Sequence, residues 1–142
     1  MFSKYDVYTT VQSMYCYPDT DVLINKLNIH DKAELKQAEE EFTAVKQMAL
    51  LQEPIKGRFT KTHLFRIHRF LFEDVYPFAG HIRKEQISKG DTMFYPPDLI
   101  ERELERVFKN IHSKKLLAEQ NEESQIQNLS QTMAELNIIH PF

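Results

Sequence analysis

The chain has 142 residues, of which 42% are hydrophobic and 27% charged, with only three glycines and six prolines. This composition is typical of one folded domain, here residues 1–142, and not of a disordered segment. A formal charge of −3 argues against nucleic acid as a ligand, no run approaches the ~20 apolar residues of a membrane span, and the N-terminus lacks the apolar core of a secretory signal.

Apolar residues spaced three and four apart predict two helices in the first half of the chain. The first covers 32–52, with Asp31 and Glu34 as cap and reciprocal partner. Its inner face is expected to contain Leu35, Ala38, Phe42, Val45 and Ala49. The second begins at the cap candidate Thr60 and ends before Pro77. It is apolar nearly all round, which indicates a central, buried helix.

The second half predicts a small hairpin and two more helices. The hairpin joins strands over 82–87 and 92–95 through a turn at 89–91. The third helix runs from the cap candidates Asp98 and Glu101 to Lys115, and the fourth covers 122–139, with acidic residues in its first turn. The third helix is expected to bury Ile100, Leu104, Val107, Phe108 and Ile111, and the fourth Ile126, Leu129, Met133 and Leu136.

The histidines and the single cysteine are the residues that most readily carry chemistry. No His-Glu-x-x-His motif or paired Cys/His spacing occurs, so we expect no dedicated zinc site. Among the six histidines, His68 is expected in the core and His30 and His112 on the surface, while His63 is open between the two. Cys16 excludes an internal disulfide, so we expect a buried, unreactive thiol and a cytoplasmic protein.

His140 is the histidine whose placement favours catalysis. Pro141 biases it away from helical backbone, so it should stand on a loop where the last helix ends. Phe142, next along, is expected to insert back into the core. This would hold an imidazole with a pKa near ~6.5 at the rim of the helices, which suits a general base. The same placement also fits an ordinary loop histidine before a proline.

Phosphate chemistry usually requires a glycine-rich turn that leads into a helix N-terminus. The three glycines are Gly57, Gly80 and Gly90, and none follows His140. The sequence therefore contains no recognisable phosphate-binding loop.

Three segments in order resemble the Fic domain of the bacterial Fic/Doc family. They are "HLFRIHRFLFEDVYPFAGHIRKEQISKG", the "MF" that follows it, and the terminal "HPF", while "YCYPDTDVLINKLNI" is similar to the lead-in of such proteins. Tyr76, Pro77, Ala79, Gly80, Ile82 and Arg83 match the family's tyrosine–proline–aromatic–alanine–glycine–x–isoleucine–arginine element. Phe78 stands where tryptophan is common. The resemblance covers nearly the whole chain and implies a mainly α, Fic-type helical bundle with a β-hairpin flap.

The family signature continues after His-x-Phe with an acidic residue and Gly-Asn-Gly-Arg. This chain supplies His140, Pro141 and Phe142, so the resemblance implies that the C-terminal part of the domain is missing. It assigns His140 as the catalytic base and Phe142, after Pro141, as the anchor of its loop. The residue that holds Mg²⁺ and the anion hole have no counterpart, so we expect the chain as given to be inactive.

The resemblance also implies a reaction and partners. Such proteins are mostly adenylyltransferases, which move AMP from ATP, with Mg²⁺, onto a Tyr, Ser or Thr hydroxyl of a target protein (AMPylation). The flap would hold the target backbone through Ile87, Ser88, Lys89, Gly90 and Phe94. Two alternatives are a non-enzymatic fragment or pseudoenzyme that binds a protein, and a Fic-fold enzyme with another phosphate donor. No Ser/Thr-x-x-x-Glu inhibitory motif occurs, so an inhibitor would lie in a further segment or in a partner chain.

Overall fold

Four helices and one short hairpin make up the described part of the chain. The structure, a computed structural model, describes residues 12–113 and 121–142. Its helices are α1 (Lys32–Gln52), α2 (Lys61–Phe72), α3 (Pro97–Ser113) and α4 (Glu122–Ile139). Strand β1 (Ser88–Lys89) pairs antiparallel with β2 (Thr92–Met93). The expected helical architecture with a small hairpin is confirmed. Within 12–113 and 121–142, no helix has the length and apolarity needed to cross a membrane.

Side-chain caps begin three of the four helices. Asp31, Thr60 and Asn121 each accept a hydrogen bond from a backbone N–H three residues on, as expected for the first two. Helix α3 begins instead at Pro97, whose fixed φ and missing N–H suit the first helical position. The predicted cap Asp98 therefore lies inside the first turn. The predicted end of this helix at Lys115 lies outside the described residues.

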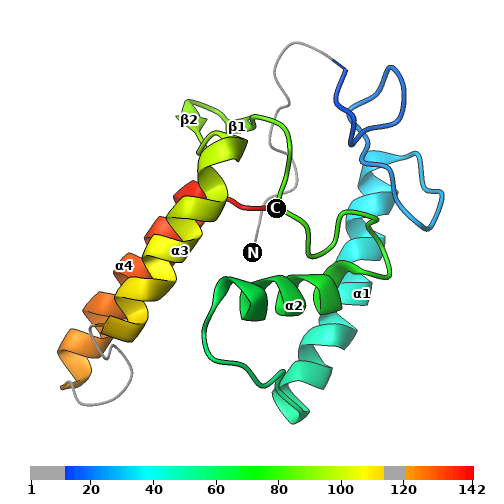
Figure 1. Ribbon diagram of the computed structural model, residues 1–142. Coiled ribbons are helices and arrows are strands. Elements are labelled where there is room, and N and C mark those ends of the chain that lie inside the picture. The colour runs from blue at the N-terminus through cyan, green and yellow to red at the C-terminus, as the bar shows by residue number, and fades with distance from the viewer. Residues whose placement is uncertain (1–11, 114–120) are drawn as a thin grey trace.

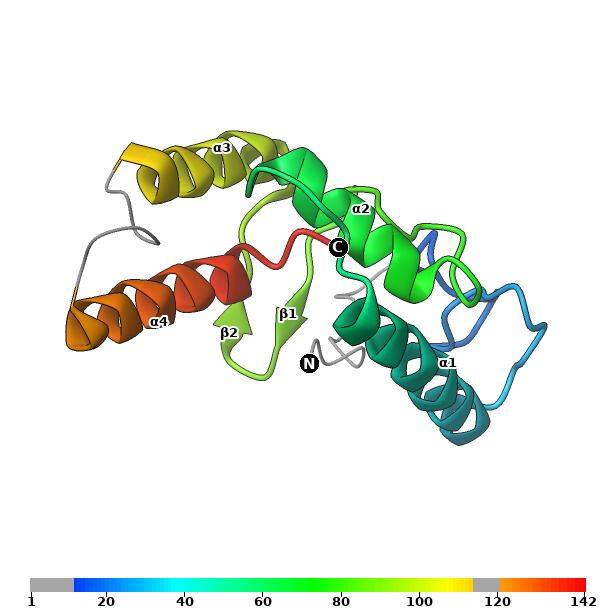
Figure 2. The same cartoon turned by 90° about the horizontal axis from the view of Figure 1, so that it is seen from below.

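Helix α2 is shorter than predicted. It ends at Phe72, and the chain then turns, so that Val75 and Tyr76 are buried outside any helix. Helix α2 packs against α1 on one side and α3 on the other, and α3 packs against α4. Figures 1 and 2 show α3 and α4 side by side, with the end of the chain running from α4 to the middle of the molecule beside α2.

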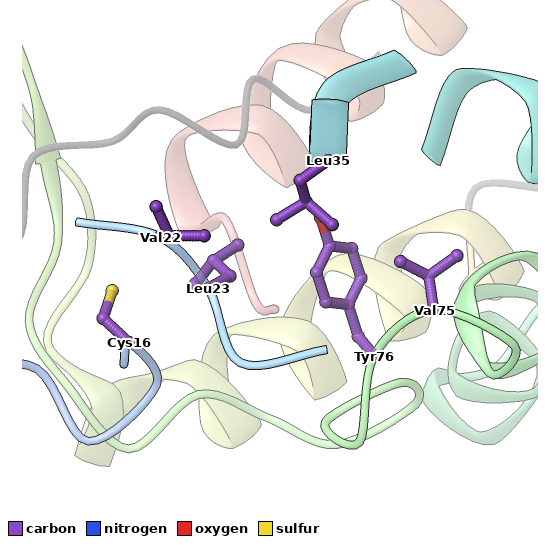
Figure 3. Packing of buried hydrophobic residues seen from close by; sticks show 6 residues of the cluster. All are labelled: Cys16, Val22, Leu23, Leu35, Val75 and Tyr76. Atoms are coloured by element: carbon purple, nitrogen blue, oxygen red, sulfur yellow. The ribbon is translucent and has the colours of Figure 1, made fainter. Parts of the chain in front are cut away.

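The core consists of two clusters, one in each half of the molecule. Figure 3 shows the first, which contains Cys16, Val22, Leu23, Leu35, Val75 and Tyr76. An isolated antiparallel β-bridge pairs the backbones of Cys16 and Leu23 in its N-terminal part. The Tyr76 hydroxyl donates a hydrogen bond to the buried carboxylate of Glu39 on α1. Cys16 is 5% exposed and unbonded to another cysteine, as expected, and burial raises the pKa of its thiol.

The second cluster confirms the inner face predicted for the third helix. It contains Ile100, Leu104, Val107, Phe108 and Ile139, with Ile111 partly buried against it. Of the inner faces predicted for α1 and α4, only Leu35 is buried and only Ala38 and Leu136 are partly buried. Phe42, Val45, Ile126, Leu129 and Met133 are 39–70% exposed. Among the described elements α1 packs only on α2 and α4 only on α3, so one apolar face of each is left uncovered.

The hairpin is shorter than the sequence predicts. Only two residues of each strand pair, around a turn in which Gly90 takes a φ of 57°, as the first position of a tight hairpin turn favours. The predicted strand 82–87 does not pair with the return strand along its length. The Arg83 N–H donates instead to the Pro141 carbonyl oxygen, and the Glu85 carboxylate accepts from Ser13 and Met14. These bonds connect the lead-in of the hairpin to other parts of the chain.

Candidate active site

His140 ends helix α4 in a left-handed backbone conformation. Its φ and ψ are 46° and 69°, and its N–H still donates to the Leu136 carbonyl oxygen at 3.0 Å. Such a conformation costs an ordinary residue roughly 1–2 kcal/mol. It turns the chain sharply out of the helix, after which Pro141 prevents the helix from continuing. The loop that carries His140 is therefore held in a strained shape by its surroundings.

Arg83 supplies most of the bonds that hold this loop. Its Nε donates to the His140 carbonyl oxygen at 2.7 Å and its Nη2 to the Ile139 carbonyl oxygen at 3.0 Å. The same guanidinium donates to the carbonyl oxygens of Tyr95 and Glu85. The carbonyls at a helix C-terminus lack partners within the helix, and a cation there also suits the helix dipole. Arg83 meets both needs while only 5% exposed.

The imidazole of His140 is buried, not exposed at a rim. It is 9% exposed and stacks on the Phe94 ring, with centroids 4.4 Å apart and planes inclined by 19°. Burial and, to a smaller extent, the positive charges of Arg83 and Lys89 together lower its pKa to about 4. The expected ordinary pKa is therefore wrong. At neutral pH the ring is unprotonated, which is the form that a general base requires.

Phe142 packs into the molecule, as predicted, with His68 as its main partner. The two rings stack at 3.7 Å with planes inclined by 14°, and the edge of Phe65 meets Phe142 at 5.7 Å. His68 accepts a hydrogen bond from the Gly80 N–H at its Nδ1, at 2.9 Å. Burial, followed by the nearby His140, lowers the His68 pKa to about 3. His68 is a core histidine, as expected, and from α2 it supports the end of the loop through its contact with Phe142.

The predicted flap residues divide into an inner and an outer set. Ile87 is 3% exposed and Phe94 half-buried, so these two side chains face the body of the molecule. Lys89 and Gly90 are exposed and Ser88 is half-buried. The structure thus brings Phe94 against His140 and leaves the tip of the hairpin outside. Whether the flap residues bind a target stays a prediction.

Two polar residues of the site were missed at the sequence level. Arg83 was noted only as part of a motif, and the polar residues that follow it, Lys84 to Gln86, gave no sign that its charge is buried. Gln86 bonds across the base of the hairpin, its Nε2 donating to the Phe94 carbonyl oxygen at 2.7 Å. His63, left open above, is structural. It accepts from the Phe59 N–H at Nδ1, so Nε2 carries the proton that goes to the Ile55 carbonyl oxygen.

The described residues offer no cluster of metal ligands. Across 12–113 and 121–142, no three His, Cys, Asp or Glu side chains come together in a group that could hold a metal ion. The described residues therefore form no ready-made metal site, and any Mg²⁺ there would depend on ligands from elsewhere.

The chain is similar to named adenylyltransferases and to a solved Fic-fold structure. It is 35% identical over 136 residues to a probable protein adenylyltransferase of Sinorhizobium fredii, covering 95% of this chain and 69% of that protein. It is 31% identical over 128 residues to the probable protein adenylyltransferase Fic of Escherichia coli, covering 90% and 63%. The chain thus spans about two thirds of the length of these relatives.

Comparison with solved structures shows that the chain also has the fold of a crystallised bacterial effector. The BepC effector of Bartonella tribocorum, crystallised with bound AMPPNP, superimposes with a TM-score of 0.81 at 23% identity, over 90% of this chain and 68% of that one. The sequence profile of the Fic/DOC family matches residues 58–142, which include α2, the hairpin and the His140 loop. The profile match and the identity to the Sinorhizobium protein together establish that the chain belongs to the Fic/DOC family.

Proposed function

We propose that this chain is part of a protein adenylyltransferase that moves AMP from ATP onto a Tyr, Ser or Thr hydroxyl of a target protein. His140 is the general base, Pro141 and Phe142 anchor its loop, and the hairpin holds the target. The names of the relatives support the reaction class. The role of each residue rests on the geometry around His140.

The observation that carries the proposal is the position of the His140 ring, stacked on Phe94 on a loop that Arg83 holds. The ring is unprotonated at neutral pH, because burial and two nearby cations lower its pKa to about 4. It is held against Phe94 at the base of the hairpin. A neutral imidazole fixed between a helix end and a strand pair is arranged to accept a proton from a group that the hairpin presents. An ordinary loop histidine needs none of these features.

The proposed reaction transfers one proton and one nucleotidyl group. The imidazole takes the proton from the target hydroxyl while the hydroxyl oxygen attacks the α-phosphorus of ATP. The bond between the α- and β-phosphates breaks, and pyrophosphate leaves. Position and charge stabilisation supply most of the rate in such transfers. The described residues supply the base and its support.

ATP is the proposed donor because the relatives are adenylyltransferases and the crystallised neighbour binds AMPPNP, an ATP analogue. Mg²⁺ usually accompanies ATP, bound to carboxylates and phosphates. Since the described residues do not form a metal site, we derive no step through the ion.

The target is proposed to lie along the hairpin as an added strand. Ser88, Lys89 and Gly90 are the outer residues that would meet it, while Ile87 and Phe94 hold the hairpin in place. An inhibitory partner chain or segment belongs to the same proposal, since this sequence has no Ser/Thr-x-x-x-Glu inhibitory motif.

The test is AMP transfer with labelled ATP and a bacterial lysate, for the 142-residue chain and for the longer product if the reading frame continues. His140→Ala should lower transfer by roughly 10²–10⁴-fold and leave ATP affinity by calorimetry unchanged. His30→Ala, a change at an exposed histidine, is the matched control and should have no effect. The chain as given is expected to be inactive.

Two outcomes would change the conclusion. Transfer by His140→Ala at the wild-type rate would show that His140 is not the base. Transfer by neither protein, together with retention of a lysate protein by the hairpin, would favour the alternative of a protein-binding module.

The pH profile gives a further check, because a base with a pKa of about 4 stays unprotonated from pH 8 down to pH 5.5. Loss of activity near pH 6.5 in this range would indicate an exposed, ordinary histidine.

A further inference from the structure

The hairpin and its flanking residues, here called the hairpin segment (83–95), are hydrogen-bonded at both ends to the C-terminal end of helix α4 and the loop after it. At the start of the segment, the Arg83 N–H donates to the Pro141 carbonyl oxygen at 3.0 Å. At its end, the Tyr95 N–H donates to the Ile138 carbonyl oxygen at 3.3 Å. The hairpin between them is therefore attached to the His140 loop twice, once on each side of His140 in the sequence.

The Arg83 side chain joins these two attachments. It reaches the carbonyl oxygens of Ile139 and His140 on the loop and that of Tyr95 at the far end of the hairpin segment. It also reaches the Glu85 carbonyl oxygen at 2.8 Å, close to the near end. A planar guanidinium carries donors in a fixed fork, so it can hold several acceptors in one geometry, whereas an ammonium group acts as a point charge.

We propose that Arg83 is a positioning residue that fixes the flap and the His140 loop relative to each other. A target strand laid on the hairpin is then presented to the imidazole at a set distance. The inference rests on the proposed function for its consequence in catalysis, but the coupling itself is a property of the fold. Arg83 touches no reacting atom. It acts through the backbone of His140 and of Tyr95.

The groups around His140 agree with this role. Arg83 and Lys89 bring positive charge, His68 lies on the α2 side, and Phe94 covers the ring from the hairpin. Loss of the guanidinium should move the His140 pKa upward, toward its ordinary value, because one of the two cations is removed. The burial of the ring, the larger cause, would oppose a full return.

The first test uses Arg83→Lys, which keeps the charge and loses the fork. Hydrogen exchange of the Tyr95 amide should become at least tenfold faster, while amides in the middle of α1 keep their rates. Lys84→Gln removes a neighbouring, exposed positive charge and is the matched control, with no change expected. Unchanged exchange at Tyr95 in Arg83→Lys would overturn the proposal, whatever the activity.

A measurement on the unmodified chain keeps the test decisive if the variant does not fold. The Arg83 Nε–H proton should be protected from exchange as strongly as the Tyr95 amide, each measured against its own rate in an unfolded chain, since one opening event would release both. Fast exchange of this proton beside a protected Tyr95 amide would overturn the proposal.

Activity of the longer product separates this inference from the proposed function. In that product, Arg83→Lys should lower kcat for AMP transfer at least tenfold with ATP affinity unchanged. Faster exchange at Tyr95 with undiminished kcat would overturn the positioning role and leave the proposed function standing. Faster exchange in a protein that transfers no AMP in any form would support the coupling and refute the proposed function.

Discussion

Protonation of His68 should destabilise the fold in mild acid. His68 accepts the Gly80 N–H at Nδ1, so a second proton has no place on this nitrogen without breaking that bond. The ring is also stacked on Phe142 and 7% exposed. The substitution that tests this is His68→Asn, since the asparagine amide oxygen can accept the same N–H and carries no titratable proton. The variant loses part of the stacking on Phe142, but this loss is the same at every pH and does not affect the pH dependence.

The size of the effect follows from the two states of the group. In the unfolded chain the His68 pKa is ordinary, 6.5, and in the fold it is lowered to about 3. The stability due to the neutral ring is therefore complete above pH 6.5 and is lost progressively as the pH falls toward 3. Between pH 7 and pH 5 the loss amounts to about 2 kcal/mol of unfolding free energy. His140 contributes a loss in the same direction between pH 6.5 and 4.

The measurement is the free energy of unfolding in urea at pH 7 and pH 5, for the wild-type chain and His68→Asn. The wild type should lose about 2 kcal/mol more than the variant over this range. His30→Asn, at an exposed position, should follow the wild type. Equal losses in the wild type and His68→Asn would refute the reasoning, because the variant retains every other titratable group.

Two further substitutions test the hairpin and the loop before α2. Ser88→Pro removes a strand N–H and should raise KM for the target with ATP affinity unchanged, while Ser88→Ala, which keeps the N–H, should behave as the wild type; a normal KM in the proline variant would argue against strand addition. Gly57→Ala would place a Cβ about 2.4 Å from the His63 ring, which hydrogen bonds to Ile55 and Phe59 hold in place. It should lower the unfolding free energy by about 1–3 kcal/mol, and an unchanged urea midpoint would contradict this.

Periodicity predicted what depends on local sequence. The helices at 32–52 and 122–139 have the predicted bounds, and the caps Asp31 and Thr60 are the predicted residues. These features arise from the 3.6-residue repeat and from side-chain oxygens that meet nearby N–H groups. The inner face of α3 was predicted for the same reason.

Features that depend on distant partners were not predictable in the same way. The exposed apolar residues of α1 and α4 follow the helical repeat perfectly well, but burial depends on whether another element covers them. The strand predicted at 82–87 has the right residues for pairing, yet the N–H groups of Arg83 and Lys84 bond to Pro141 and Tyr15, and the carboxylate of Glu85 accepts from 13–14. The burial of His140 and its lowered pKa also come from Arg83, Lys89 and Phe94, which are at least 46 residues away in the sequence.

Because the hairpin is attached to the His140 loop at both ends, its tip can change in length and sequence while its base stays in place. At the tip, a Cβ added to Gly90 would meet no atom within 4 Å. Lengthening a loop costs little, about 0.6 kcal/mol for each doubling, when its ends are held by the rest of the fold. Insertions and new side chains at the tip would thus alter what the hairpin meets without moving the base of the loop. Under the proposed function, the binding preference of the hairpin could therefore change at its tip while the His140 loop keeps its geometry.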